Sequence, residues 1–219
     1  TQMAVAFFDL DRTLIDCNSG RLWMQSEWRH GRIRLRTVAW GTYWLTKYHL
    51  GYGGGLEEAY RQGVLSLTGL LEDDLEEQTR TWFDAEVVHR LRPGAQAAIQ
   101  AHRERGDRVV LATSASVYEA RCAAKEWDLE LGVSTSFTVE QGRFTGEILE
   151  WGYGHHKWIA AQKWVEREHE SLDAAYFYTD SKTDLPLMEH VGHPIAVHPD
   201  RKLRRIARER GWPIVSWDV

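Results

Sequence analysis

The sequence of 219 residues has only two cysteines, Cys17 and Cys122, which excludes a framework of several disulfide bonds and a four-thiolate metal site. It has no run of 18 apolar residues, so no membrane-spanning helix is expected. The apolar stretch Met3–Phe8 is too short for a signal peptide. Positive charge is not in excess: 27 Lys and Arg face 32 Asp and Glu, which argues against nucleic-acid binding as the main task. We therefore expect a protein of the reducing cytoplasm.

What the sequence does contain is enough apolar material for a core, with 43% hydrophobic and 27% charged residues. Five short runs are apolar throughout, which is typical of strands buried on both faces of a parallel sheet. These runs are Met3–Phe8, Arg108–Thr113, Ala174–Tyr178, Pro194–Val197 and Pro213–Trp217.

Helical patterns alternate with these runs and predict a doubly wound, Rossmann-like α/β fold. The predicted helices are Ala95–Arg105, Val117–Trp127, His155–His169 and Asp184–His190. Phe137–Glu140 and Arg143–Ile148 flank Gln141-Gly142 and predict a β-hairpin. The basic segment Arg201–Arg210 has apolar residues on one helical face, so we interpret it as a surface helix rather than a nucleic-acid patch.

One interval has no buried strand. Between Asp16 and Arg92 the patterns are amphipathic and helical, and the segment is far longer than an ordinary crossover between parallel strands. We therefore predict an α/β core made of residues 1–17 and 91–219, with a helical insertion of residues 18–90 after the first strand, called the cap below. The glycine-rich segment 51–55 divides this cap.

Acidic residues follow two of the predicted strands. Asp9 and Asp11 end the first strand, and Asp180 and Asp184 follow the third. In doubly wound sheets, ligands bind beyond the carboxyl ends of the strands. Four carboxylates in one crevice would repel each other without a cation, and an oxygen-rich site of this kind suits Mg²⁺.

A hydroxyl, backbone amides and a lysine complete the candidate site. Ser114 and the amide of Ala115 follow the second strand at a helix start, where they could hold phosphate oxygens. Lys157 could supply a fixed positive charge. Each residue alone has an ordinary explanation: a helix cap for Ser114, a solvated surface position for Lys157, acids that favour a helix N-terminus. Their occurrence together at strand ends favours a functional site.

Four segments carry a resemblance to a known family: Phe7–Leu14 (FFDLDRTL), Val109–Ser116 (VVLATSAS), the segment around Lys157, and Tyr178–Val197. The chain resembles the haloacid dehalogenase-like hydrolases, specifically the phosphoserine-phosphatase-like branch. The resemblance covers the whole predicted core. The predicted cap matches only in its position and helical character.

The resemblance implies a Mg²⁺-dependent phosphatase that forms an aspartyl-phosphate. Asp9 would be the nucleophile and Asp11 the general acid and base. The cation would bridge Asp9, the carbonyl of Asp11 and Asp180. Asp184 would support it either as a ligand or through contacts with the groups that bind it. The phosphoryl oxygens would be held by Ser114, Ala115 and Lys157.

The substrate is expected to be a small phosphorylated metabolite. Phosphoserine phosphatases of this branch carry a Glu about nine residues after the nucleophile, where it pairs with the substrate amine; this chain has Asn18 there. Arg61 could meet a substrate carboxylate. Without the glutamate, phosphoserine itself is a possible substrate and not a favoured one.

Several alternatives stay open. The same phospho-aspartate could serve a phosphotransferase or mutase, and the same crevice could serve a phosphate-binding module. Aromatic residues of the predicted cap could form its core, a pocket wall, or with nearby basic residues a membrane-facing surface for a lipid phosphate. These aromatic residues are Trp40, Tyr43, Trp44, Tyr48 and Tyr52. The oligomeric state is not predicted, and a membrane partner is not favoured.

Overall fold

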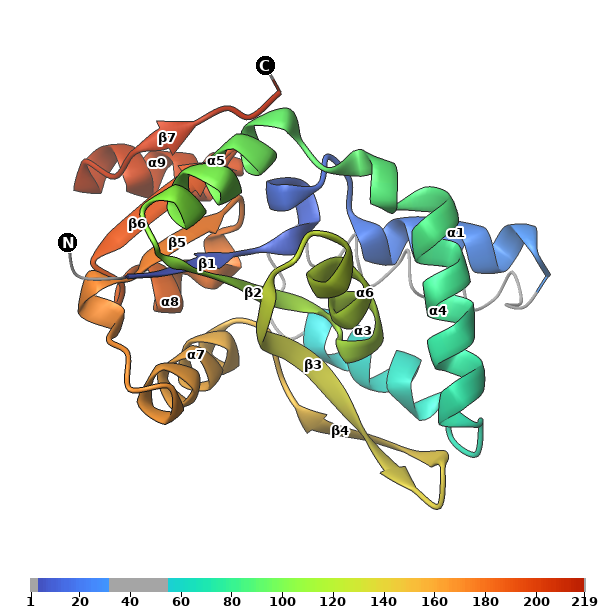
Figure 1. Cartoon of the computed structure of the whole chain (residues 1–219). Coiled ribbons are helices and arrows are strands. Elements are labelled where there is room, and N and C mark those ends of the chain that lie inside the picture. Colours follow the sequence, from blue (N-terminus) through green and yellow to red (C-terminus); the bar gives the residue numbers. More distant parts are fainter. Residues whose placement is uncertain (1–3, 32–54, 219) are drawn as a thin grey trace.

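A computed structural model describes residues 4–31 and 55–218, and a seven-stranded sheet lies at its centre (Figure 1). The strand order is β4-β3-β2-β1-β5-β6-β7. All neighbouring strands pair in parallel except β3 and β4, which form an antiparallel hairpin. The strands are β1 (Val5–Phe8), β2 (Arg108–Ser116), β3 (Glu130–Glu140), β4 (Arg143–Glu150), β5 (Tyr176–Thr179), β6 (His193–Val197) and β7 (Ile214–Val215).

The sheet is buried on both faces. Ala6 and Phe8 of β1 pack into one apolar cluster, and Val5 and Phe7 pack into the other, as the alternation of a strand requires. Helices α5 (Pro93–Glu104) and α6 (Val117–Glu126) contribute to the first cluster. The second cluster draws on α7 (His155–Arg167), α8 (Leu185–Met188) and α9 (Arg201–Arg210). The predicted doubly wound α/β fold is confirmed.

The described residues of the segment predicted to form the cap contain the α-helices α1 (Ser19–Arg29), α3 (Gly55–Leu65) and α4 (Glu72–Glu86). Helices α1 and α4 lie side by side (Figure 1), and the rings of Trp23 and Trp82 meet edge-to-face with centroids 5.1 Å apart. Helix α3 packs against β4. The boundary of the cap at residues 18–90 stays a prediction, and its aromatic residues between Trp40 and Tyr52 lie outside the described part of the chain.

Several predicted boundaries were wrong. Strand β2 continues to Ser116 instead of ending at Thr113. Strand β3 begins at Glu130, because its first half pairs with β2 and only its second half forms the hairpin. The alternation of small and polar residues in that first half hid it from a search for apolar runs. Helix α8 is also shorter than predicted. Among the described residues, none of the helices is long and apolar enough to cross a membrane.

The last strand is likewise shorter than predicted, because the chain leaves the sheet after Val215. The amide of Gly94 donates to the carbonyl of Trp217 at 3.1 Å. A Cβ atom on Gly94 would lie only 2.6 Å from the backbone of Trp217, so only glycine permits this approach. Trp217 is therefore buried against the start of α5 instead of continuing β7.

A buried histidine joins α5 to the sheet. Nδ1 of His102 lies 2.8 Å from Oδ2 of Asp107, and its Nε2 lies 2.8 Å from the hydroxyl of Tyr178. A neutral imidazole satisfies both contacts by donating to Asp107 and accepting from Tyr178. Burial lowers the pKa of His102 below its usual value, although Asp107 opposes the shift.

This lowered pKa predicts that stability declines on acidification. The unfolded chain takes up a proton near pH 6.5, whereas the folded imidazole does so only at lower pH, so protons favour unfolding below about pH 6.5. The free energy of unfolding, measured in denaturant at pH 7.5 and 5.5, is expected to fall less in His102→Gln than in the wild type. The exposed His89 provides the control: His89→Gln should keep the wild-type difference. An identical decline in all three proteins would contradict the prediction.

Candidate active site

Asp9 stands at the carboxyl end of the central strand β1, where it is buried with 5% exposure. Its amide donates to the carbonyl of Tyr178 at 2.9 Å, which continues the pairing with β5. The chain then makes one irregular turn, η1 (Leu10–Leu14), in which Arg12 adopts a positive φ of 56°. Asp11 leaves this turn to accept a hydrogen bond from the amide of Ser19 at 2.7 Å. Turn and helix α1 thus hold two carboxyl groups at one end of the sheet.

Lys157 lies in the first turn of α7, and its ammonium group is enclosed among these acids. Its exposure is 1%, so the interpretation of this residue as a solvated surface lysine is wrong. Nζ lies 2.9 Å from Oδ1 of Asp9 and 2.9 Å from Oδ2 of Asp184. Burial lowers the pKa of Lys157, but the two carboxylates outweigh burial and raise it above the usual value. The lysine is therefore a permanent cation that occupies one oxygen of Asp9 and leaves Oδ2 without a partner among the described residues.

Asp180 directly follows β5, the neighbour of β1, and its carbonyl accepts from the amide of Asp200 at 2.8 Å. Its side chain makes no hydrogen bond or ion pair within the described part of the chain. Burial, together with the charges of Asp9 and Asp184, raises its pKa to about 8. The pKa of Asp9 is raised to about 7, mainly by burial and against the effect of Lys157. The raised pKa values of these two buried carboxyl groups indicate that the positive charge around them does not balance two carboxylates. A bound cation would supply the missing charge.

The donor set fits Mg²⁺ in chemistry. No three His, Cys, Asp or Glu side chains among the described residues form a metal cage by themselves. Magnesium needs no such cage, because it binds through one or two carboxylates and completes its shell with water and phosphate. Asp184 already holds Lys157 and accepts from Thr179 Oγ1 at 2.6 Å, which places it behind the site rather than at an open position.

The end of β2 supplies the candidate phosphate contacts. Ser114 still belongs to the strand, and Ser116 is the residue that caps α6, so the interpretation of Ser114 as a helix cap is wrong. The hydroxyl of Ser114 makes no hydrogen bond with another described residue, while its carbonyl accepts from Tyr60 at 3.2 Å. The amide of Ala115 donates to Thr113 Oγ1 at 3.0 Å, so it is partly engaged within the strand end.

The two predicted substrate contacts from the cap are engaged otherwise. Oδ1 of Asn18 accepts from the amide of Arg21 at 2.9 Å and caps α1. Its amide nitrogen makes only a long contact of 3.5 Å with Asp11. The guanidinium of Arg61 is exposed and lies 5.2 Å above the ring of Trp151. The structure brings neither side chain to Asp9, and both assignments stay predictions.

Glu119 is a polar residue near the acids that the sequence did not single out. Ser116 and Glu119 form the pattern of a capping box, in which the glutamate serves the helix N-terminus. In the structure the carboxyl group is buried instead, and burial together with the charge of Asp11 raises its pKa to about 8. The signal available in the sequence was the glutamate three residues after Ser116, which ends the segment Val109–Ser116.

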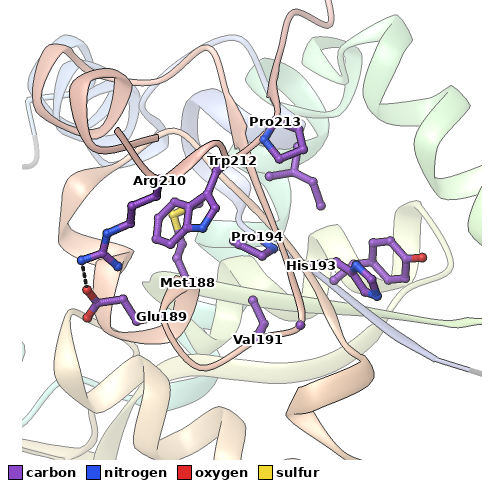
Figure 2. A pocket seen from close by; sticks show the side chains of 11 residues that line it. Met188, Glu189, Val191, His193, Pro194, Arg210, Trp212 and Pro213 are labelled. Carbon is purple, nitrogen blue, oxygen red and sulfur yellow. Dashed lines mark ion pairs between the residues drawn. The ribbon is translucent and has the colours of Figure 1, made fainter. Parts of the chain in front are cut away.

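A cavity of about 410 Å³ lies elsewhere, at the opposite ends of the strands (Figure 2). Tyr176 and His193, the first residues of β5 and β6, line it, and Glu189 pairs with Arg210 at its edge. Its wall is otherwise largely apolar and contains none of the acids described above. The candidate active site is therefore the cluster at the carboxyl ends of the strands, not this cavity.

Comparisons with known proteins show the family of the chain. A family profile described as haloacid dehalogenase-like hydrolase matches residues 6–189. A histidinol-phosphatase of Neisseria meningitidis serogroup C is 27% identical, and the match covers 97% of this chain and 98% of that protein.

Solved structures show the same fold. The crystal structure of a protein of unknown function from Bordetella pertussis Tohama I has a TM-score of 0.87 and 26% identity, covering 98% of this chain and 99% of the other. A phospho-aspartyl intermediate analogue of phosphoserine phosphatase has a TM-score of 0.68 and 17% identity, covering 100% and 95% of the two chains.

Proposed function

The chain belongs to the haloacid dehalogenase-like hydrolases, in their phosphoserine-phosphatase-like branch, and is a phosphatase; we propose that it hydrolyses a small-molecule phosphomonoester through a phosphorylated Asp9. The observation that carries the proposal is the environment of Asp9. One of its oxygens is held by Lys157, the other has no partner among residues 4–31 and 55–218, and Asp180 follows the neighbouring strand.

The chemistry follows from these positions. Oδ2 of Asp9 attacks phosphorus, and the bond from phosphorus to the ester oxygen breaks. Asp11, whose pKa is raised by burial, gives its proton to the departing alcohol. A water molecule then loses its proton to Asp11 and attacks the phosphorus of the acyl phosphate. This step releases inorganic phosphate and restores Asp9.

In this proposal, positive charge for the phosphoryl group comes from the ammonium group of Lys157 and from Mg²⁺. Lys157 is fixed on one side of Asp9 by Asp184, and Ser114 offers a hydroxyl from the end of β2. Asp9, Asp180 and the carbonyl of Asp11 would hold Mg²⁺. Bound there, the cation supplies charge neutralisation for the transferring phosphoryl group.

The substrate class is a small phosphorylated metabolite. Support comes from the relatives, whose names include a histidinol-phosphatase and a phosphoserine phosphatase.

Turnover of a generic ester tests the proposed function. p-Nitrophenyl phosphate should be hydrolysed with release of inorganic phosphate in the presence of Mg²⁺. Removal of divalent cations with a chelator should lower the rate by roughly 10²-fold or more, because the buried carboxylates and the phosphoryl group are then uncompensated. Mg²⁺ added in excess of the chelator should restore it.

Product analysis separates the alternatives. A new phosphoester in place of inorganic phosphate, when an acceptor alcohol is present, would identify a phosphotransferase. Binding of phosphate esters without any turnover at all metal concentrations would identify a binding module and refute the proposal.

A further inference from the structure

The carbonyl oxygen of Ser114 accepts hydrogen bonds from two hydroxyl groups that lie outside its own strand. The hydroxyl of Tyr60, on α3, donates to it at 3.2 Å, and Oγ1 of Thr135, on β3, donates to it at 3.0 Å. A carbonyl oxygen has two lone pairs and can accept both. The two hydroxyl groups also contact each other. One carbonyl group near the end of β2 therefore joins this strand to β3 and to a helix from the segment predicted to form the cap.

These contacts hold β2 where its pairing with β3 is irregular. Ala112 lies opposite Val133. Four residues further along β2, Ser116 lies opposite Thr135, which is only two residues further along β3. Such a register shift disrupts the ladder of backbone hydrogen bonds that steadies a regular strand. The hydroxyl groups thus hold Ser114 within the irregular stretch.

The hydroxyl of Thr135 extends this arrangement toward α7. The amide of Gly152 donates to Thr135 Oγ1 at 3.1 Å, and a Cβ atom at this glycine would collide with the carbonyl oxygen of Thr113. The amide of Gly152, the hydroxyl of Thr135 and the carbonyl of Ser114 form a chain in which each hydrogen bond strengthens the next. The chain connects two parts of the candidate site, because α7 begins soon after Gly152 and carries Lys157 in its first turn.

The hydroxyl of Tyr60 is a fixed donor on a ring that packing holds in place. The ring centroid lies 5.8 Å from that of Trp151 and 6.5 Å from that of Phe137. Burial raises the pKa of the hydroxyl above its usual value, so the group keeps its proton. Because phenylalanine retains the ring, Tyr60→Phe removes the hydrogen bond and keeps these aromatic contacts.

Holding the carbonyl of Ser114 also holds the candidate phosphate contacts. This carbonyl and the amide of Ala115 belong to one planar peptide group. The amide donates to Thr113 Oγ1 at 3.0 Å, so the peptide is held from both sides. The side chain of Ser114 branches from the Cα atom that begins this plane. The hydroxyl and the amide are therefore in place before a ligand arrives, and groups that need no further ordering bind more tightly.

We propose that Tyr60 and Thr135 are positioning residues whose hydroxyl groups fix the Ser114–Ala115 peptide for binding of the phosphoryl group. The inference rests on the proposed function, in which Ser114 contacts phosphoryl oxygens. Neither Tyr60 nor Thr135 touches the phosphoryl group, because both act through the carbonyl of Ser114. Since Tyr60 belongs to α3, the affinity for phosphate depends on the position of this helix.

Inorganic phosphate is the probe, because it has no alcohol part and reports on the phosphoryl contacts alone. Its dissociation constant in the presence of Mg²⁺ is measured by titration followed by ³¹P NMR. Tyr60→Phe should raise this constant about fivefold, which corresponds to the loss of one hydrogen bond. Thr135→Val should raise it as well, and Thr135→Ser, which retains the hydroxyl, should stay near the wild-type value. An unchanged constant in folded Tyr60→Phe overturns the proposal.

Tyr118→Phe is the matched control. The hydroxyl of Tyr118, on α6, donates to Oε1 of Glu72, on α4, at 2.8 Å. This variant therefore also removes a tyrosine hydroxyl that joins the segment predicted to form the cap to the rest of the chain, but it leaves the bonds to Ser114 intact. It should keep the wild-type dissociation constant, and a rise equal to that of Tyr60→Phe overturns the proposal. If Tyr60→Phe does not fold, equal constants for Thr135→Val and Thr135→Ser overturn it instead.

Mg²⁺ activation provides a readout that a general distortion of the site would move. The Mg²⁺ concentration that gives half of the maximal rate of p-nitrophenyl phosphate hydrolysis should be the same in Tyr60→Phe and the wild type, because Asp9 and Asp180 keep their surroundings. A change as large as that in the phosphate dissociation constant overturns the positioning role.

Failure of this proposal is distinct from failure of the proposed function. If the wild type hydrolyses p-nitrophenyl phosphate and Tyr60→Phe binds phosphate as the wild type does, only the positioning role is refuted. If the wild type binds phosphate without hydrolysing the ester, the proposed function is refuted and the titrations still decide the role of Tyr60. Absence of phosphate binding by the wild type refutes both.

Discussion

Replacing Asp9 by asparagine is expected to reduce turnover of phosphomonoesters by roughly 10⁴-fold or more, because an amide cannot form the acyl phosphate. The substitution is isosteric at the end of β1, where the side chain is buried against Lys157. The amide oxygen can still accept from the ammonium group. The circular dichroism spectrum and cooperative unfolding should therefore be retained, and steady-state kinetics with p-nitrophenyl phosphate measures the effect.

The control for this substitution is Asp128→Asn, at a side chain that is 96% exposed. It should keep wild-type kinetics. A second check is trapping: wild-type enzyme quenched in acid during turnover of a ³²P-labelled ester should carry label, and Asp9→Asn should not. Normal turnover by folded Asp9→Asn would refute the assignment of the nucleophile.

Replacing Lys157 by methionine is expected to destabilise the protein by about 3 kcal/mol in the presence of a chelator, because two buried carboxylates lose their shared cation. Lys157 is 1% exposed and touches both Asp9 and Asp184. Methionine fills a similar volume, so the loss reflects charge rather than an empty space. Denaturant unfolding followed by tryptophan fluorescence measures it.

Magnesium gives this experiment a second readout that does not depend on activity. If Asp9 and Asp180 bind the cation, added Mg²⁺ should restore part of the lost stability of Lys157→Met, because it supplies charge to the same carboxylates. Lys163→Met, on the exposed side of the same helix, should change stability by less than about 0.5 kcal/mol. Equal stabilities of Lys157→Met and Lys163→Met would contradict a charge-balancing role for Lys157.

The elements that the sequence predicted well are those whose burial is uniform. Strand β1 and the core of β2 are apolar at every position, and both faces of the sheet are covered, so the apolar run itself reports the strand. Strand β3 failed this criterion, since its residues alternate between buried and partly exposed positions as it passes from the sheet to the hairpin. Its first half pairs with β2, a contact that only the assembled sheet contains.

The sequence alone determined that acids follow the strands. The order of the strands in the sheet determined that these acids lie close together. Asp9 and Asp180 are 171 positions apart but end adjacent strands, because β1 and β5 pair in parallel. Composition and spacing sufficed for this inference, since carboxyl ends of parallel strands share one edge.

Only the tertiary structure decided the state of each charged group. The sequence predicts Lys157 as a source of positive charge but does not show where its ammonium group lies, and the packing of α7 encloses it between two carboxylates. Glu119 follows the cap residue Ser116 in the pattern of a capping box, yet its carboxyl group is buried, and burial together with the charge of Asp11 raises its pKa to about 8. Charge state depends on distance and on exclusion of water, and neither is fixed until helices from distant parts of the chain close over the same strand ends.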